Sequence, residues 1–125
     1  MALTQIVSTL LEFQNQVKIY HWSTDKYARH VATDTLFNNL GQNIDKFIEA
    51  YQGSRNKKLK ISGKCILTLI HINDSNMLDY LKDFAKWLSD DLPKLLDQKY
   101  DTDLLNIRDE ILTDVNKTVY LFSFN

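Results

Sequence analysis

The chain has 125 residues, of which 44% are hydrophobic and 25% are charged, with three glycines, one proline, one cysteine and a net charge of −1. This length and composition are typical of globular proteins, so we treat residues 1–125 as a single domain. The small net charge excludes a global field that would attract nucleic acid or an anionic membrane, and the lone cysteine excludes an intramolecular disulfide.

Apolar residues recur at helical spacing from the beginning of the chain, and this pattern predicts a first helix over about residues 2–22. The polar run Ser23-Thr24-Asp25 offers N-cap residues for a second helix from about 25 to 52, and Gly53 is the residue type that commonly follows a helix. The apolar stripe of this second helix consists of Phe37, Leu40, Ile44, Phe47 and Tyr51.

A connection without helical periodicity follows the second helix. Residues 54–64 are rich in lysine and arginine and are interpreted as a solvated basic loop. Residues 65–72 are apolar and β-branched, and periodicity alone leaves three alternatives for them, namely a short strand, an extended crossover or a helical piece.

The second half of the chain predicts two more helices. The third is capped by Asp74 or Ser75 and ends or kinks near Leu92, unless Pro93 opens a new turn. The fourth is capped by Asp101 or Thr102. The predicted fold class is therefore all-α, a four-helix bundle with one crossover connection between helices two and three.

Two polar pairs on the second helix carry the chemistry of this sequence. His30 and Asp34 form one i, i+4 pair, and Asp45 and Glu49 form the other. All four lie on one stripe of the helix, away from the apolar stripe. The two pairs are symmetric about the midpoint of the segment 30–49, because His30 and Glu49 are as far from that midpoint as each other, and so are Asp34 and Asp45. His30 and Asp45 are ~22 Å apart along a helix, so one chain cannot bring both pairs to one metal ion.

An antiparallel two-fold pairing of this helix would place His30 beside Glu49 of a second copy, with Gly41 near the middle of the stripe permitting close approach. Imidazole and carboxylate ligands suit Fe(II), Mn(II) or Zn(II). His21, at the end of the first helix, would reach the same cleft, and Trp22 would shield it. The alternative is that these residues are ordinary solvated groups on the outer face of a helix.

These residues resemble the ferroxidase motif of the Dps family, the mini-ferritins of the ferritin-like superfamily. In that pattern His-Trp closes the first helix, a histidine follows early in the second, and acids follow it at intervals of four, eleven and four residues. His21-Trp22, His30, Asp34, Asp45 and Glu49 match it, with a shorter turn between the helices. The segment 103–122 also resembles the last helix of the family.

The resemblance implies a ferritin-like fold in which His21, His30 and Asp34 of one subunit bind iron together with Asp45 and Glu49 of its two-fold partner. His30, Asp34, Asp45 and Glu49 would then be the catalytic residues of a ferroxidase that oxidises Fe(II), usually with hydrogen peroxide. The implied roles are iron storage and protection from oxidative stress, in a homo-oligomer that is commonly a dodecameric cage.

Two alternatives to a ferroxidase remain. One is a non-enzymatic helical dimer or scaffold, and the other is a dimer that binds Zn or Mn structurally. We expect no nucleic-acid binding through the N-terminus, because the lysine-rich tail of some Dps proteins is missing. The chain has no predicted signal peptide and no apolar run of ~18 residues, so we expect a cytoplasmic protein without a membrane segment.

Overall fold

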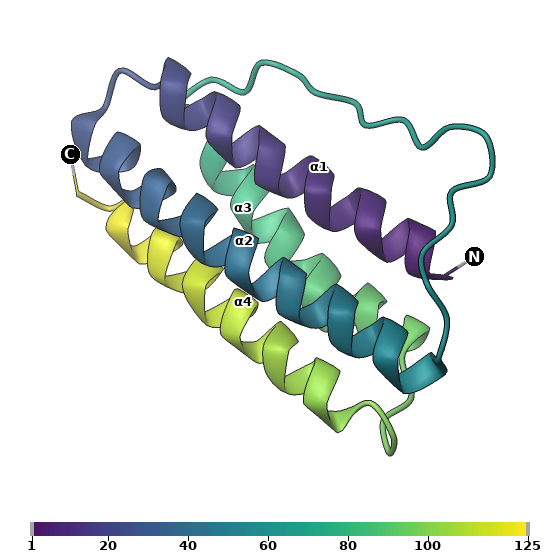
Figure 1. Ribbon diagram of the computed structural model, residues 1–125. Coiled ribbons are helices and arrows are strands. Elements are labelled where there is room, and N and C mark those ends of the chain that lie inside the picture. Colours follow the sequence, from purple (N-terminus) through teal and green to yellow (C-terminus); the bar gives the residue numbers. More distant parts are fainter. Residues whose placement is uncertain (1, 125) are drawn as a thin grey trace.

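The computed structural model describes residues 2–124, which form four α-helices packed side by side (Figure 1). The helices are α1 (Ala2–Ser23), α2 (Tyr27–Arg55), α3 (Met77–Lys86) and α4 (Thr102–Leu121). A π-helical turn, η1 (Trp87–Asp91), and a 3-10 turn, η2 (Leu92–Leu95), follow α3. No strand occurs between residues 2 and 124. The predicted all-helical bundle is therefore confirmed.

The helices enclose one hydrophobic core. α1 packs against α2, α2 against α4, and α3 against α4. Leu40, Ile44 and Phe47 of the predicted α2 stripe are buried, whereas Phe37 and Tyr51 are only partly buried at its margin. Burying a side chain of this size contributes about 1.5–3 kcal/mol, so the apolar stripes account for the association of the helices.

The end of α2 differs from the prediction. Gly53 lies inside the helix, which continues to Arg55, and Asn56 takes the left-handed conformation that ends it, with φ of 50°. Its N–H donates to the carbonyls of Gln52 and Gly53. Asparagine tolerates this conformation better than most residues. The last turn of α2 is bonded to the start of α4, because Arg55 donates two hydrogen bonds of 2.7 and 2.8 Å to Asp101.

The connection between α2 and α3 is an extended crossover, which decides between the three alternatives for residues 65–72. It runs back along the outside of α1, so that α3 begins at the same end of the bundle as α2 (Figure 1). Ile72 is buried and anchors its end in the core. The crossover therefore makes α2 and α3 parallel, whereas α1 and α2 are antiparallel, and so are α3 and α4 (Figure 1).

Asp74 fastens the crossover to the turn between α1 and α2. Its carboxylate accepts hydrogen bonds from the Tyr20 hydroxyl at 2.7 Å and from the Thr24 hydroxyl at 2.6 Å, and its carbonyl accepts one from Arg29 at 2.8 Å. The hydrogen bonds from Thr24 and Tyr20 lower the pKa of the Asp74 carboxyl. Because Asp74 is used in this way, it does not cap α3, and the residue at that cap is Asn76.

Pro93 lies in the first turn of η2, so it opens a new turn, and α3 has already ended at Lys86. Asp101 occupies the N-cap position of α4 without a side-chain capping bond, since its carboxylate accepts from Arg55 and from the N–H of Asp97. None of the helices in the described part of the chain is long and apolar enough to span a bilayer.

Candidate metal centre

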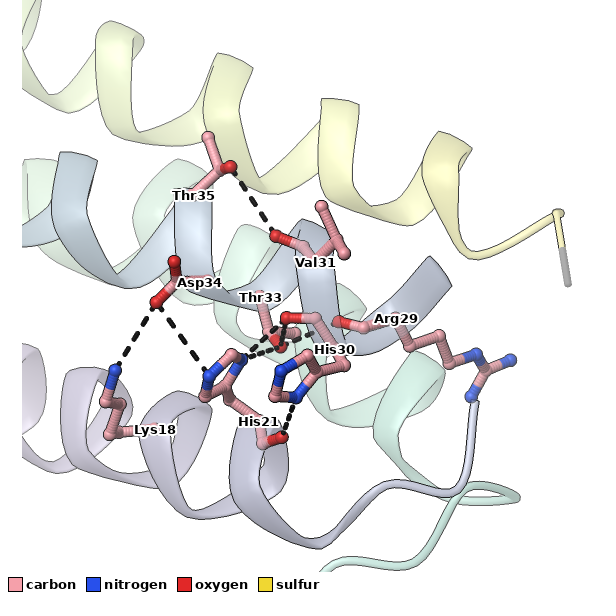
Figure 2. Close-up of polar contacts among 8 residues, drawn as sticks. All are labelled: Lys18, His21, Arg29, His30, Val31, Thr33, Asp34 and Thr35. Carbon is pink, nitrogen blue, oxygen red and sulfur yellow. Dashed lines mark hydrogen bonds and ion pairs between the residues drawn. The ribbon is translucent and has the colours of Figure 1, made fainter. Parts of the chain in front are cut away.

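His21 and His30 face each other across the turn that joins α1 to α2. Their imidazole rings stack with centroids 3.9 Å apart and an angle of 14° between the planes. His21 Nδ1 lies 2.6 Å from the carbonyl oxygen of His30, and His30 Nδ1 lies 2.7 Å from the carbonyl oxygen of His21 (Figure 2). The carbonyl of His21 is in the last turn of α1, where helical carbonyls have no partner within the helix. The two histidines thus satisfy each other's backbone.

These hydrogen bonds determine which ring nitrogen carries the proton. A carbonyl oxygen can only accept, so Nδ1 of each ring must be the donor. In the neutral rings, Nε2 is then the unprotonated nitrogen of both His21 and His30. A hydrogen bond from one ring nitrogen to a backbone carbonyl is also the usual way in which proteins orient a histidine that ligates a metal through the other.

Asp34 lies one turn beyond His30 on the same side of α2. Its Oδ1 is 3.8 Å from Nε2 of His21, which is too long for a hydrogen bond. Two acceptors that face each other at this distance repel unless a proton or a cation lies between or beside them. The side chain of Asp34 is half exposed, whereas that of His21 is 10% exposed, so the gap opens toward solvent on the carboxylate side.

Lys18 supplies positive charge at this point. Its Nζ lies 3.4 Å from Oδ1 of Asp34 and 4.6 Å from the ring centroid of Phe37. Lys18 precedes His21 by about one helical turn, which brings its ammonium to the same face of α1. A metal ion at Asp34 would have to displace this ammonium or share the carboxylate with it.

Thr33 lies beside the histidine pair. It is fully buried, its hydroxyl donates to the carbonyl of Arg29 at 2.7 Å, and the same oxygen lies 3.5 Å from Nδ1 of His21 (Figure 2). Neither Lys18 nor Thr33 was predicted from the sequence to lie at this site. Their spacing from His21 and His30 was the available signal, since each lies three residues away on the same helix.

Asp45 and Glu49 stand apart from this group. Both are exposed on α2, and eleven residues separate Asp34 from Asp45, which corresponds to ~16 Å along a helix. Between residues 2 and 124, no three side chains of His, Cys, Asp or Glu are placed so that they could hold a metal ion. His21 lies between its neighbours, stacked on His30 and 3.8 Å from Asp34, without the three side chains converging on one point. We call these three residues the imidazole half-site, and the exposed Asp45 and Glu49 the acid half-site.

The roles expected of Trp22 and Gly41 concern a contact between two chains, and both stay predictions. In the single chain the side chain of Trp22 is 70% exposed, and the Lys18 ammonium lies 5.7 Å from the centroid of its ring. Gly41 has a contact within the chain, since a Cβ atom added there would lie 3.3 Å from Nε2 of Gln14 on α1. A larger residue at position 41 would therefore also press on Gln14 within the chain.

Residues 21–122 match the model of a family of unknown function, DUF5856. The chain belongs to this family. The DUF5856 match begins at His21 and includes His30, Asp34, Asp45 and Glu49, so it contains both half-sites, while Lys18 lies outside it. No curated protein and no solved structure matches the chain.

Proposed function

We propose that this protein binds iron at imidazole and carboxylate sites completed by two copies of the chain and oxidises Fe(II) there, as Dps proteins do. The observation that carries the proposal is the position of His21 Nε2, which lies 3.8 Å from the Asp34 carboxylate while Nδ1 of the same ring is bonded to the carbonyl of His30. The ring of His30 stacks against it and is bonded through Nδ1 in the same way. Iron storage and protection from peroxide would follow from this activity in a larger homo-oligomer, including a dodecameric cage.

The donor set of the imidazole half-site suits a borderline divalent ion. It offers two imidazole nitrogens and a carboxylate without a thiolate, a combination found with Fe(II), Zn(II) and Mn(II). The acid half-site of a second copy would add two carboxylates, which compensate the charge of a second ion. An antiparallel two-fold pairing of α2 would bring the two half-sites together twice in each dimer.

Iron is the substrate in this proposal, and the reaction balances with hydrogen peroxide as oxidant. Two Fe(II) ions each lose one electron, the O–O bond of peroxide breaks, and two protons complete two water molecules. Taking both electrons at one site avoids the release of a hydroxyl radical. The protein's residues bind and orient the ions, and the exposed edge of Asp34 gives access from solvent.

Mixing two inactive variants tests whether the site is shared between chains. His30→Ala and Asp45→Ala should each abolish peroxide-dependent Fe(II) oxidation, followed by absorbance. In a dimer of one His30→Ala and one Asp45→Ala chain, one site carries both defects and the other carries neither. Random exchange should therefore restore about one quarter of the wild-type rate. No restoration, or full activity in either variant alone, would reject the shared site.

The matched control is His71→Ala. His71 is an exposed histidine on the crossover and touches neither half-site, so its replacement should leave the rate unchanged. Wild-type protein that oxidises Fe(II) no faster than the His30→Ala variant would refute the ferroxidase function itself.

A second candidate is a non-enzymatic helical dimer or scaffold in which the histidine pair is structural. It is favoured by the two Nδ1 bonds that already join α1 to α2, and by Lys18, which neutralises Asp34 without a metal. This alternative predicts that Zn(II), Mn(II) and Fe(II) leave the melting temperature unchanged. Under the first proposal, each bound ion raises it, because ligands that bind only the folded state stabilise it.

A further inference from the structure

Side chains of α1 hydrogen-bond to backbone groups of the crossover, in the place where a neighbouring strand of a sheet would bond. The side-chain amide of Gln16 accepts from the N–H of Ile70 at 2.6 Å and donates to the carbonyl of Ile70 at 2.9 Å. One turn earlier, the carboxylate of Glu12 accepts from the N–H of Thr68 at 2.8 Å. These are the backbone groups that a sheet partner would satisfy.

The spacing of the two elements explains the match. Residues i and i+4 of a helix are ~6 Å apart along its axis, and residues i and i+2 of an extended chain are ~6.6 Å apart. Glu12 and Gln16 therefore meet Thr68 and Ile70 in register. The extended conformation of this segment is fixed by α1, although no strand pairs with it within the described residues.

The opposite edge of the segment has no partner. In an extended chain, the backbone groups of successive residues point to alternate edges, so those of Leu67, Leu69 and His71 point away from α1. Among residues 2–124 they make no hydrogen bond. Ile66, Leu69 and Ile70 are 79%, 46% and 56% exposed. An open edge lined by apolar side chains is a template for pairing with another extended segment.

We propose that residues 66–72 pair with the same segment of a second copy as a two-stranded antiparallel ladder centred on Leu69. This register pairs Leu69 with Leu69 and Leu67 with His71, which uses all the free backbone groups. It also brings Ile70 of each chain beside Thr68 of the other, on the exposed face.

Charge supports a second copy in this orientation. Residues 57–72 contain four lysines and no acid. The antiparallel register sends the two lysine-rich stretches to opposite ends of the ladder, where they are far apart. A parallel arrangement would set like charges side by side, which is destabilising.

This edge is separate from the face proposed for metal binding. Gln14, which contacts Gly41 of α2, and the pair Glu12 and Gln16 lie on opposite faces of α1, since two residues along a helix correspond to a rotation of ~200°. Figure 1 likewise shows the crossover on the side of α1 away from α2. The ladder is therefore independent of the pairing of α2, and a protein with both contacts would assemble beyond a dimer.

Disulfide trapping tests the ladder. In the Cys65→Ser/Leu69→Cys variant, the two cysteines would face each other at a hydrogen-bonded pair, with Cα atoms ~5.5 Å apart, within the range that a disulfide spans. Mild oxidation should give a covalent dimer nearly completely. In the wild type, the two Cys65 residues would lie ~27 Å apart in the ladder and should not form this bond.

The matched control is Cys65→Ser/Ile61→Cys, which places a cysteine at another exposed crossover position. It should cross-link at least tenfold more slowly than the Leu69→Cys variant. Equal rates in the two variants would overturn the proposal.

A second variant tests the backbone bonds directly. Leu69→Pro removes the central N–H, so self-association measured by sedimentation should weaken at least tenfold. Leu69→Thr keeps the N–H and should associate like the wild type. If Leu69→Pro associates as strongly as the wild type, the ladder is overturned. The open edge would then be a site for an extended segment of another protein. Metal binding is measured separately, so failure of one proposal leaves the other intact.

Discussion

His21 and His30 each donate Nδ1–H to the carbonyl oxygen of the other, at 2.6 and 2.7 Å, and so join the last turn of α1 to the first turns of α2. The same two bonds occupy Nδ1 of each ring and leave each Nε2 free of these backbone contacts. One local arrangement therefore joins the two helices, and under the proposed function it would also orient the two rings toward a cation.

The structural part of this role predicts the effect of His30→Ala. The substitution leaves the carbonyl of His21 without its donor at the end of α1, and the lost bond should lower the free energy of unfolding by about 1–2 kcal/mol. Urea denaturation followed by circular dichroism measures it. The exposed His71→Ala control should change stability by less than about 0.5 kcal/mol. Equal midpoints for the two variants would contradict a stabilising pair.

Lys18 is expected to oppose metal binding. Its ammonium lies 3.4 Å from Oδ1 of Asp34, so Lys18→Met removes a competing positive charge while keeping an apolar chain beside Phe37. We expect the Kd for Zn(II), measured by calorimetry, to fall several-fold. Lys99→Met, which removes an exposed lysine from the turn before α4, is the control and should leave this Kd unchanged. Weaker binding by Lys18→Met would mean that the ammonium does not compete.

The ion pair of Arg55 and Asp101 predicts a loss of stability in acid. The hydrogen bonds from Arg55 hold the pKa of the buried Asp101 carboxyl below its ordinary value. A carboxyl whose pKa is lower in the folded state contributes stability above its unfolded pKa, near about 4. That contribution is lost as the pH falls through the lower folded pKa.

Asp101→Asn should therefore reduce stability by about 2 kcal/mol at pH 7, because a charge-assisted pair is broken, and by progressively less as the pH falls below about 4. Melting temperatures between pH 2 and 7 measure the difference from the wild type. The exposed Asp103→Asn provides the comparison, with a small effect at every pH. A difference that stays constant down to pH 2 would refute the role of the ion pair.

Gln16 should control the order of the crossover. Gln16→Ala removes both bonds to Ile70, so hydrogen exchange at the N–H of Ile70 should accelerate at least tenfold. Exchange at the N–H of Thr68, which Glu12 accepts, should change much less and serves as the internal control. Equal acceleration at both positions would indicate that the segment is released as one unit and that Gln16 has no local role.

The sequence alone predicted the helices because their signal is local. Apolar residues at intervals of three and four, as at Leu40, Ile44 and Phe47, determine which face of a helix is buried whatever lies opposite. The same pattern placed His30, Asp34, Asp45 and Glu49 on an outward stripe. Their spacing also showed that one chain cannot join the two pairs.

Contacts between segments distant in the sequence decided the rest. Gly53 has the residue type of a helix end, yet α2 continues past it toward Asp101, which is recruited from α4. Asp74 is a good capping residue, but Tyr20 and Thr24 of the first turn occupy its carboxylate. In both cases a hydrogen bond to a remote partner outweighs a local preference worth about 1 kcal/mol.

The candidate site divides in the same way. Residue types and intervals in the sequence predicted an imidazole and carboxylate site shared with a second chain, and that sharing stays a prediction. Only the packing of α1 against α2 determined that His21 and His30 exchange hydrogen bonds, that Lys18 reaches Asp34 and that Trp22 faces solvent. The physical reason is that a tautomer and a charge environment depend on distances of a few ångströms across a turn, which the periodicity of a single helix does not encode.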